Sequence, residues 1–310
     1  MKTARFEIRT DLALEEREGL KEQAKEVSGV SFRKWKGKTE DVQITEVKVL
    51  NEAGAEILGK PVGSYLTLEA DRLLLPDEDF HSEVSDELAN VLKELAEHAL
   101  GKKEGEEKEA TFLHGQPVIL VAGLGNQSVT PDSLGPRTVN NLSVSQNETG
   151  LKAIAPGVMA QTGMETARIL SGLIREIKPD LVIAIDALAA RSIRRLGTTI
   201  QLTDTGIHPG SGVGNHRHSL TKETLGIPVL AVGVPTVVGA AAIVHDTISA
   251  LTGVLASEEA TKNTGKWLEN MTPEDQYRMI RELLEPEVGS IYVTPPDIDQ
   301  RVKQLSFTIS

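Results

Sequence analysis

Cysteine is absent from this chain of 310 residues, which excludes disulfides, thiolate metal sites, iron–sulfur clusters and cysteine nucleophiles. Aromatic residues make up only 3% of the chain, too few for the stacked rings that bind single-stranded nucleic acid. Basic residues number 33 against 45 acidic ones, a formal net charge of −12, which argues against nucleic acid or an anionic membrane as a direct partner. No apolar run reaches the roughly 18 residues of a membrane-spanning helix. We therefore expect a cytoplasmic protein that acts on small molecules or polypeptides.

Two continuous apolar runs stand out in the middle of the chain. They are Pro117–Ala122 and Leu181–Ile185, and such runs are typical of strands buried on both faces. Between them, apolar residues recur at helical spacing over Thr162–Ile177. The alternation then continues through strands expected at Thr198–Leu202 and Pro228–Val232 and an apolar helix expected at Val237–Leu251. This alternation predicts an α/β fold with a mostly parallel central sheet covered on both faces, a three-layer sandwich.

The chain divides into a core with additions at both ends. Residues 13–110 are expected to form a peripheral part, with a β-rich unit over 42–70, a helix over Ser85–Leu100 and a charged linker. Residues 111–255 contain the strand and helix alternation and are expected to be the α/β catalytic core. Residues 256–310 are expected to be a helical extension, because Thr272, Pro273 and Glu274 read as the start of a helix.

One aspartate is associated with each of the two buried runs. Asp132 lies in the loop 123–136 after the first run, and Asp186 directly follows the second. Because ligands bind beyond the carboxyl ends of parallel strands, we expect both carboxylates at the same edge of the sheet. Two carboxylates held close together share a proton, so one can activate water while the other protonates a leaving group. The pair predicts general acid–base hydrolysis, although a turn at Asp132 and a helix cap at Asp186 are the plainer structural interpretations.

A glycine-rich loop over 208–218 is a further candidate. Small residues there permit the backbone of a ligand to approach closely, and no Lys-Ser/Thr pair of a phosphate loop follows them. We therefore expect this loop to bind the extended backbone of a substrate and not a nucleotide. The expected substrate-binding residues are Gly210, Ser211, Gly212, Gly214 and Asn215.

Three other interpretations stay open. His208, His216 or His218 could join Asp132 and Asp186 in a zinc or nickel site, which would make the chain a metal-dependent hydrolase or a maturation-type protease. A polar surface loop is the plainer interpretation of these histidines, and no metal or cofactor is expected. The chain could also bind peptides without catalysis. The triplet Asp204-Thr205-Gly206 is typical of pepsin-like proteases, which carry it once in each lobe. It occurs only once here, in a chain whose α/β pattern does not fit that class and which is far longer than the retroviral half-enzyme.

Several longer segments of the chain carry a resemblance to a known family: GNQSVTPDSLGP (125–136), APGVMAQTGMET (155–166), IDALAARSIRRLGTTIQLTDTGIHPGSGVGNHR (185–217), GVPTVV (233–238) and RTDLALEE (9–16). On these segments the chain resembles the spore germination proteases of endospore-forming bacteria. The resemblance implies a core similar to that of the hydrogenase-maturation proteases. It also implies an atypical aspartic endopeptidase whose two catalytic aspartates fall on Asp132 and Asp186.

The resemblance implies a substrate, a state of assembly and a way of activation. Members degrade small acid-soluble proteins that protect DNA in the spore core, so the chain is expected in the forespore, as a homotetramer without direct contact to nucleic acid or membrane. They are made as inactive zymogens that cleave off an N-terminal propeptide. Here the propeptide would be residues 1–12, removed by self-cleavage between Leu12 and Ala13.

Overall fold

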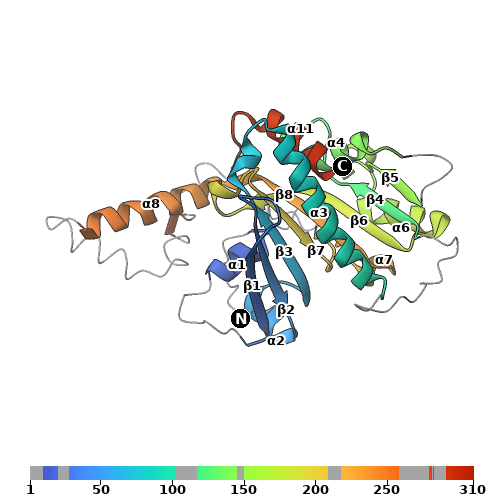
Figure 1. The fold of residues 1–310 in the computed structure, drawn as a ribbon, viewed down its shortest axis with the longest axis horizontal. Helices are drawn as coiled ribbons and strands as arrows, with labels where there is room; N and C mark the ends of the chain where they lie inside the picture. Colours follow the sequence, from blue (N-terminus) through green and yellow to red (C-terminus); the bar gives the residue numbers. More distant parts are fainter. Residues whose placement is uncertain are drawn as a thin grey trace.

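The computed structural model describes residues 10–19, 28–101, 117–144, 150–208, 218–257, 279–280, 282 and 291–310. Several expectations fall on residues outside these ranges. They are the first nine residues of the expected propeptide, the charged linker from residue 102, the substrate-binding loop from Gly210 to Asn215, the candidate ligand His216, and the start of a helix at Thr272. The described residues form a mixed α/β structure (Figure 1).

The strands in the described part of the chain form one sheet. Their order across it is β1-β2-β3-β7-β8-β6-β4-β5, and β9 pairs with the end of β8. In chain order the strands are β1 (Val30–Lys36), β2 (Gln43–Val49), β3 (Gly63–Glu69), β4 (Ile119–Gly123), β5 (Leu151–Ile154), β6 (Leu181–Ala190), β7 (Thr199–Thr203), β8 (Val229–Gly239) and β9 (Tyr292–Val293).

The sheet is mixed, so the expectation of a mostly parallel sheet is wrong. Strands β5, β4, β6 and β8 are parallel to one another, whereas β1, β2, β3, β7 and β8 pair antiparallel. The reason is the pairing of β3 with β7, in which Tyr65 lies opposite Thr203 and Glu69 opposite Thr199. This pairing makes β1–β3 one edge of the same sheet. The short β1–β2 connection also favours antiparallel pairing, since a parallel crossover needs a dozen or more residues.

Several helices begin at other residues than the sequence pattern suggests. Helix α3 begins at Glu78 because the side chain of Asp77 accepts a hydrogen bond from Phe80 N at 3.1 Å, a helix cap. Gly163, with φ of 68°, ends a short helix, so α6 begins only at Thr166. The helices are α1 (Ala13–Gly19), α2 (Glu52–Leu58), α3 (Glu78–Ala99), α4 (Leu134–Asn141), α5 (Met159–Thr162), α6 (Thr166–Ile177), α7 (Lys222–Leu225), α8 (Ala240–Ser257) and α11 (Ile298–Ile309), with 3₁₀ turns η1 (Asp71–Leu74), η2 (Thr130–Asp132) and η3 (Ile193–Arg195).

The segment expected to be helical from Val237 is divided between two elements. Its first residues belong to strand β8, and the rest belong to helix α8. The strand continues through Gly239 because it pairs there with β6 and β9, so α8 begins at Ala240. Figure 1 shows α8 extending away from the sheet. No helix in the described ranges has both the length and the apolar character needed to cross a bilayer.

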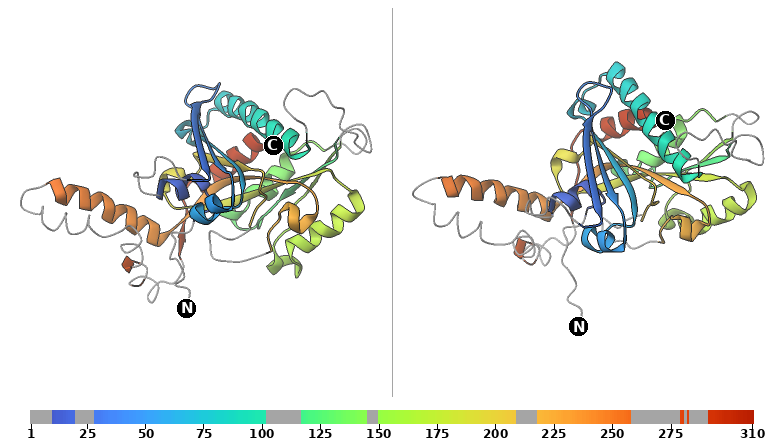
Figure 2. Two further views of the ribbon diagram at one scale, coloured as in Figure 1. Left: turned by 90° about the horizontal axis from the view of Figure 1, so that it is seen from below. Right: turned by 60° about the horizontal axis from the view of Figure 1, so that its bottom comes forward.

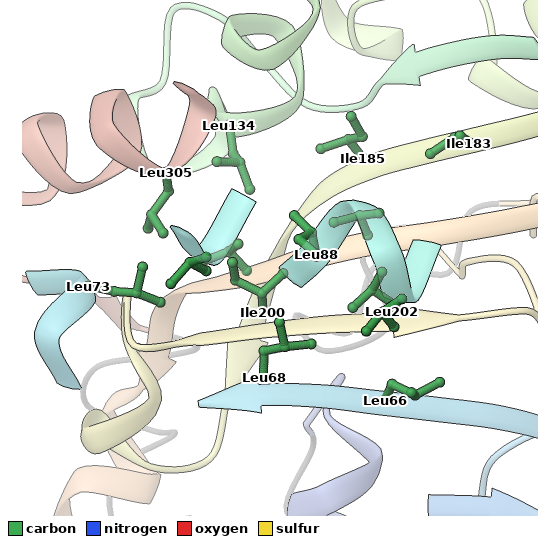
Figure 3. Close-up of a cluster of buried hydrophobic side chains, with 14 of the residues drawn as sticks. Leu66, Leu68, Leu73, Leu88, Leu134, Ile183, Ile185, Ile200, Leu202 and Leu305 are labelled. Atoms are coloured by element: carbon green, nitrogen blue, oxygen red, sulfur yellow. The ribbon is translucent and has the colours of Figure 1, made fainter. Parts of the chain in front are cut away.

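Hydrophobic side chains cover both faces of the sheet. Successive residues of β6 alternate between two clusters: Ile183 and Ile185 join α3, α4 and α11 on one face (Figure 3), and Val182 and Ala184 join α6 and α7 on the other. This is the pattern of a strand buried on both sides. Each fully buried leucine or isoleucine contributes about 1.5–3 kcal/mol to stability. A third, smaller cluster packs α1 and α2 against β2 and β3 (Figure 2).

Candidate active site

Asp132 is held by a tight turn in the loop that follows β4. It closes the 3₁₀ turn η2, where its backbone N–H donates to Val129 O at 2.8 Å. Its Oδ2 accepts a hydrogen bond from Asn126 N, also at 2.8 Å. Gly125 has φ of 110°, and a Cβ there would overlap the carbonyl oxygen of Asp132. The glycine is therefore required for the turn that fixes this carboxylate.

Asp186 lies inside a strand and not in a loop, which corrects the expected end of the run at Ile185. Strand β6 continues to Ala190 because β8 runs alongside it, with Asp186 opposite Gly233 and an irregularity after Leu188. The residue is 7% exposed, and its Oδ1 accepts a hydrogen bond from Ala187 N at 2.9 Å. The carboxylate is thus held on a rigid element of the core.

Both aspartates line one cavity. Its volume is about 380 Å³, and its wall includes Asp132 from η2, Asp186 from β6 and Thr236 from β8. Asp11, from the N-terminal segment, lines it as well. The structure therefore places the two predicted aspartates at a common cavity, as the topology of neighbouring parallel strands requires, and adds a third carboxylate that the sequence analysis did not assign to this site.

The N-terminal segment 10–15 binds along the end of β6. Asp11 N donates to Ala189 O at 3.0 Å, and Ala189 N donates back to Asp11 Oδ2 at 2.9 Å. Leu12 and Ala13, which flank the expected cleavage bond, are both 0% exposed. The segment is thus packed into the core at these two residues. Only the resemblance of RTDLALEE signalled a role for them.

Glu15 anchors the other end of this segment. Its carboxylate accepts hydrogen bonds from Arg191 N at 2.7 Å and Ser192 N at 3.0 Å, and the Thr10 hydroxyl also donates to it. Burial raises the pKa of Glu15 above its ordinary value of 4.5, although the hydrogen bonds from Thr10, Arg191 and Ser192 and the charge of Arg195 oppose the shift. The folded chain therefore binds a proton at Glu15 more readily than the unfolded chain does.

This shift predicts a measurable pH dependence. Because the pKa of Glu15 is raised on folding, its contribution to stability is fully present below pH 4.5 and is lost as the pH rises through the folded-state pKa. The side chain in Glu15→Gln does not titrate. We therefore compare the free energies of unfolding of the parent and of this variant, and expect the parent's value relative to the variant's to fall as the pH rises from 4 to 7. Urea unfolding of both chains, each carrying Asp186→Asn to prevent self-cleavage, measures the difference; a flat or rising difference would contradict the assigned shift.

A second, smaller cavity also has Asp186 in its wall. It measures about 70 Å³ and is lined by Asp11, Asp186, Tyr65, Gln201 and His208, among others. Loss of solvent and, second, the Lys60 ammonium lower the pKa of His208, while the Asp11 carboxylate opposes the shift. His208 is therefore neutral at neutral pH and lies close to the carboxylates without carrying charge.

The remaining candidate residues are placed as follows. His218 contacts Glu165 through its Nδ1, and His216 is outside the described ranges. Within those ranges, no group of three or more histidine, aspartate or glutamate side chains is arranged to hold a metal ion. Asp204, from the pepsin-like triplet, accepts a hydrogen bond from Ser64 N at 2.7 Å, which joins the start of β3 to the end of β7.

Comparison with known proteins reveals long matches. A model of the germination protease family matches residues 7–267. The germination protease of Caldanaerobacter subterraneus subsp. tengcongensis is 47% identical over 317 residues, covering 98% of this chain and 92% of that protein. That of Clostridium perfringens is 40% identical over 319 residues, with 98% and 93% covered. Among solved structures, the [NiFe] hydrogenase maturation protease HycI from Thermococcus kodakarensis is 22% identical, with a TM-score of 0.28 over 39% of this chain and 76% of that one.

Proposed function

Because this chain belongs to the germination protease family, we propose that it is an endopeptidase made as a self-activating zymogen. Its substrates are the small acid-soluble, DNA-protecting proteins of the spore, which it begins to degrade during germination in the spore core. The single observation that carries the proposal is the cavity shared by Asp132 and Asp186. Both residues lie in segments that carry the family resemblance.

The proposed chemistry is hydrolysis by the two aspartates, without a covalent intermediate. One carboxylate takes a proton from a water molecule as the water oxygen attacks the carbonyl carbon of the substrate. The other, in its protonated form, gives its proton to the amide nitrogen, and the C–N bond then breaks. The pair ends with the proton on the opposite carboxylate. At least one proton must be present on the pair, which agrees with activation at mildly acidic pH.

The zymogen proposal is supported by the position of segment 10–15. Asp11 occupies the wall of the cavity that contains the proposed catalytic pair. The segment therefore hinders a substrate from reaching that part of the cavity. The bond between Leu12 and Ala13 is buried, so we infer that the residues packed around it must open locally before water reaches this bond.

We also propose a homotetramer. Helix α8 extends from the body (Figure 1), and its Leu251 and Val254 are 52% and 57% exposed. Apolar surface of this kind is commonly buried between subunits. Light scattering of the purified chain is expected to give four times the mass of one chain, 33.4 kDa; a monomer mass at micromolar concentration would contradict the assembly.

The proposed function is tested by mass spectrometry of the intact chain at mildly acidic and at neutral pH. We expect loss of Met1–Leu12 at mildly acidic pH, followed by hydrolysis of an added small acid-soluble spore protein. A chain that keeps its mass at both values and leaves the spore protein intact would contradict the proposal. A protein of similar size and charge, without relation to the spore proteins, is the control substrate.

A further inference from the structure

The N-terminal segment is bound mainly through groups that any peptide carries. The Lys60 ammonium donates to Thr10 O at 3.0 Å and to Asp11 O at 3.2 Å. The Gln201 amide donates to Asp11 O at 3.2 Å and accepts from Ala13 N at 2.8 Å. Two side chains from separate elements, the loop after α2 and strand β7, thus hold the main chain on both sides of Leu12.

The side-chain amide of Gln201 bonds to the N-terminal segment and is buried in the sheet. It lies in the middle of the sheet, opposite Thr67, and is only 6% exposed. A buried amide costs free energy unless it is hydrogen-bonded, and both of its polar atoms bond to the N-terminal segment. Its position therefore fits a side chain that serves to bind a peptide.

The end of β6 and the residues after it bind the two acidic side chains of the segment. Ala189 N donates to the carboxylate of Asp11, and Arg191 N and Ser192 N donate to that of Glu15. The two carboxylates are four residues apart and meet three backbone N–H groups. Both carboxylate oxygens of Glu15 accept hydrogen bonds from backbone N–H groups. A glutamine there would point its own NH2 group at one of these N–H donors, so the site discriminates carboxylates from amides.

The residues between the two carboxylates are selected by size. Leu12 packs among the apolar residues on the α6 side of the sheet, and Ala13 packs against Val47, Val49 and Tyr65. Both are fully buried, so a residue larger than alanine at the second position would overlap its neighbours. The binding surface therefore fits an acidic residue, an apolar residue and a small residue in succession, with a second acidic residue two positions later.

We propose that Lys60 and Gln201, together with the backbone N–H groups of Ala189, Arg191 and Ser192, form the substrate-binding subsite of the enzyme. This proposal rests on the proposed function, since the N-terminal segment is taken as the first peptide to occupy the subsite. Lys60 and Gln201 hold the main chain of the substrate, and the N–H groups recognise its two carboxylates. Of these groups, Ala189 lies on the same strand as Asp186, three residues further along.

The first test measures hydrolysis of a synthetic peptide with the sequence of residues 8–18 by the self-processed chain. We expect Lys60→Met and Gln201→Met each to raise KM about tenfold and to leave kcat within about twofold, because the lost hydrogen bonds bind the substrate without taking part in bond cleavage. Lys48→Met, at an exposed position of β2, is the matched control and should leave both constants unchanged. Thermal unfolding verifies that each variant folds.

The second test does not depend on catalysis. A full chain carrying Asp186→Asn, Asp11→Asn and Glu15→Gln cannot hydrolyse and holds its own segment weakly, so the labelled peptide can compete for the subsite. We expect binding, measured by fluorescence anisotropy, to weaken about tenfold when Lys60→Met or Gln201→Met is added, or when Asn and Gln replace the two acidic residues of the peptide.

The two tests separate the subsite from the proposed function. Unchanged KM and unchanged binding in both variants would overturn the subsite and leave the endopeptidase proposal intact. If the parent chain hydrolyses no peptide, the endopeptidase proposal is contradicted. The anisotropy measurement then tests the subsite alone. Failure of the triple variant to bind the peptide would also overturn the subsite.

Discussion

Replacing either Asp132 or Asp186 by asparagine is expected to lower the rate of self-cleavage by about a thousandfold or more. Asparagine is close in shape to aspartate, and its carbonyl oxygen can still accept the hydrogen bond that Asn126 N donates to Asp132 or that Ala187 N donates to Asp186. It cannot take up or release a proton at neutral or mildly acidic pH. The substitutions thus preserve the geometry and remove the proton transfer, and intact mass over time measures the result.

Asp204→Asn provides the matched control for these two variants. Asp204 belongs to the triplet that resembles the pepsin-like proteases, but its Oδ1 accepts a hydrogen bond from Ser64 N, which an asparagine can retain. We expect self-cleavage within about twofold of the parent rate, since the residue stabilises a strand connection and transfers no proton. A large loss in Asp204→Asn would support the pepsin-like interpretation instead.

Two results would change the functional assignment. If Asp132→Asn and Asp186→Asn self-cleave like the parent chain, the pair is not catalytic, and cleavage that a chelator stops would then support a metal-dependent hydrolase. If no variant and no pH gives cleavage but the peptide of residues 8–18 still binds, the chain is a peptide-binding protein. Each outcome selects one of the alternatives that the sequence leaves open.

The local sequence pattern predicted the buried strands but not their ends. PVILVA (117–122) and LVIAI (181–185) are apolar without interruption. The first overlaps β4 from Ile119 onward, and the second lies within β6. The polar Asp186 suggested that the second strand ends there. The strand continues because β8 provides partners as far as Ala190, and pairing between segments some fifty residues apart leaves no local signal in the sequence.

The direction of the strands was harder to predict than their presence. Strand β7 contains the buried polar residues Thr199, Gln201 and Thr203, a pattern that shows β structure without showing which neighbour it pairs with. Its pairing with β3 on one side and β8 on the other makes half of the sheet antiparallel. The shared cavity of Asp132 and Asp186 could be predicted because both residues come after buried runs. The contacts of Lys60 and Gln201 with the N-terminal segment could not, since a lone lysine and a lone glutamine carry no motif.

Gly135→Ala is expected to reduce both stability and hydrolysis strongly. Gly135 lies at the start of α4, where a Cβ would come within 2.5 Å of Ile185 O and Leu124 N. Ile185 directly precedes Asp186, and Leu124 directly follows β4. Both atoms belong to the backbone, so they cannot rotate away as a side chain can. Overpacking of this kind costs about 3 kcal/mol. It would also displace the turn that holds Asp132, and a shift of about 1 Å lowers the rate about a hundredfold.

The matched control for Gly135→Ala is Gly172→Ala, in the exposed part of α6. A Cβ there meets no atom within 4 Å, so we expect the free energy of unfolding to rise by up to about 1 kcal/mol, because alanine favours a helix over glycine. Urea unfolding in the Asp186→Asn background measures stability, and intact mass of the single variants measures self-cleavage. A Gly135→Ala chain that is as stable and as active as the parent would show that α4 can move away from β4 and β6. The close backbone contact would then not be what places Asp132 beside Asp186.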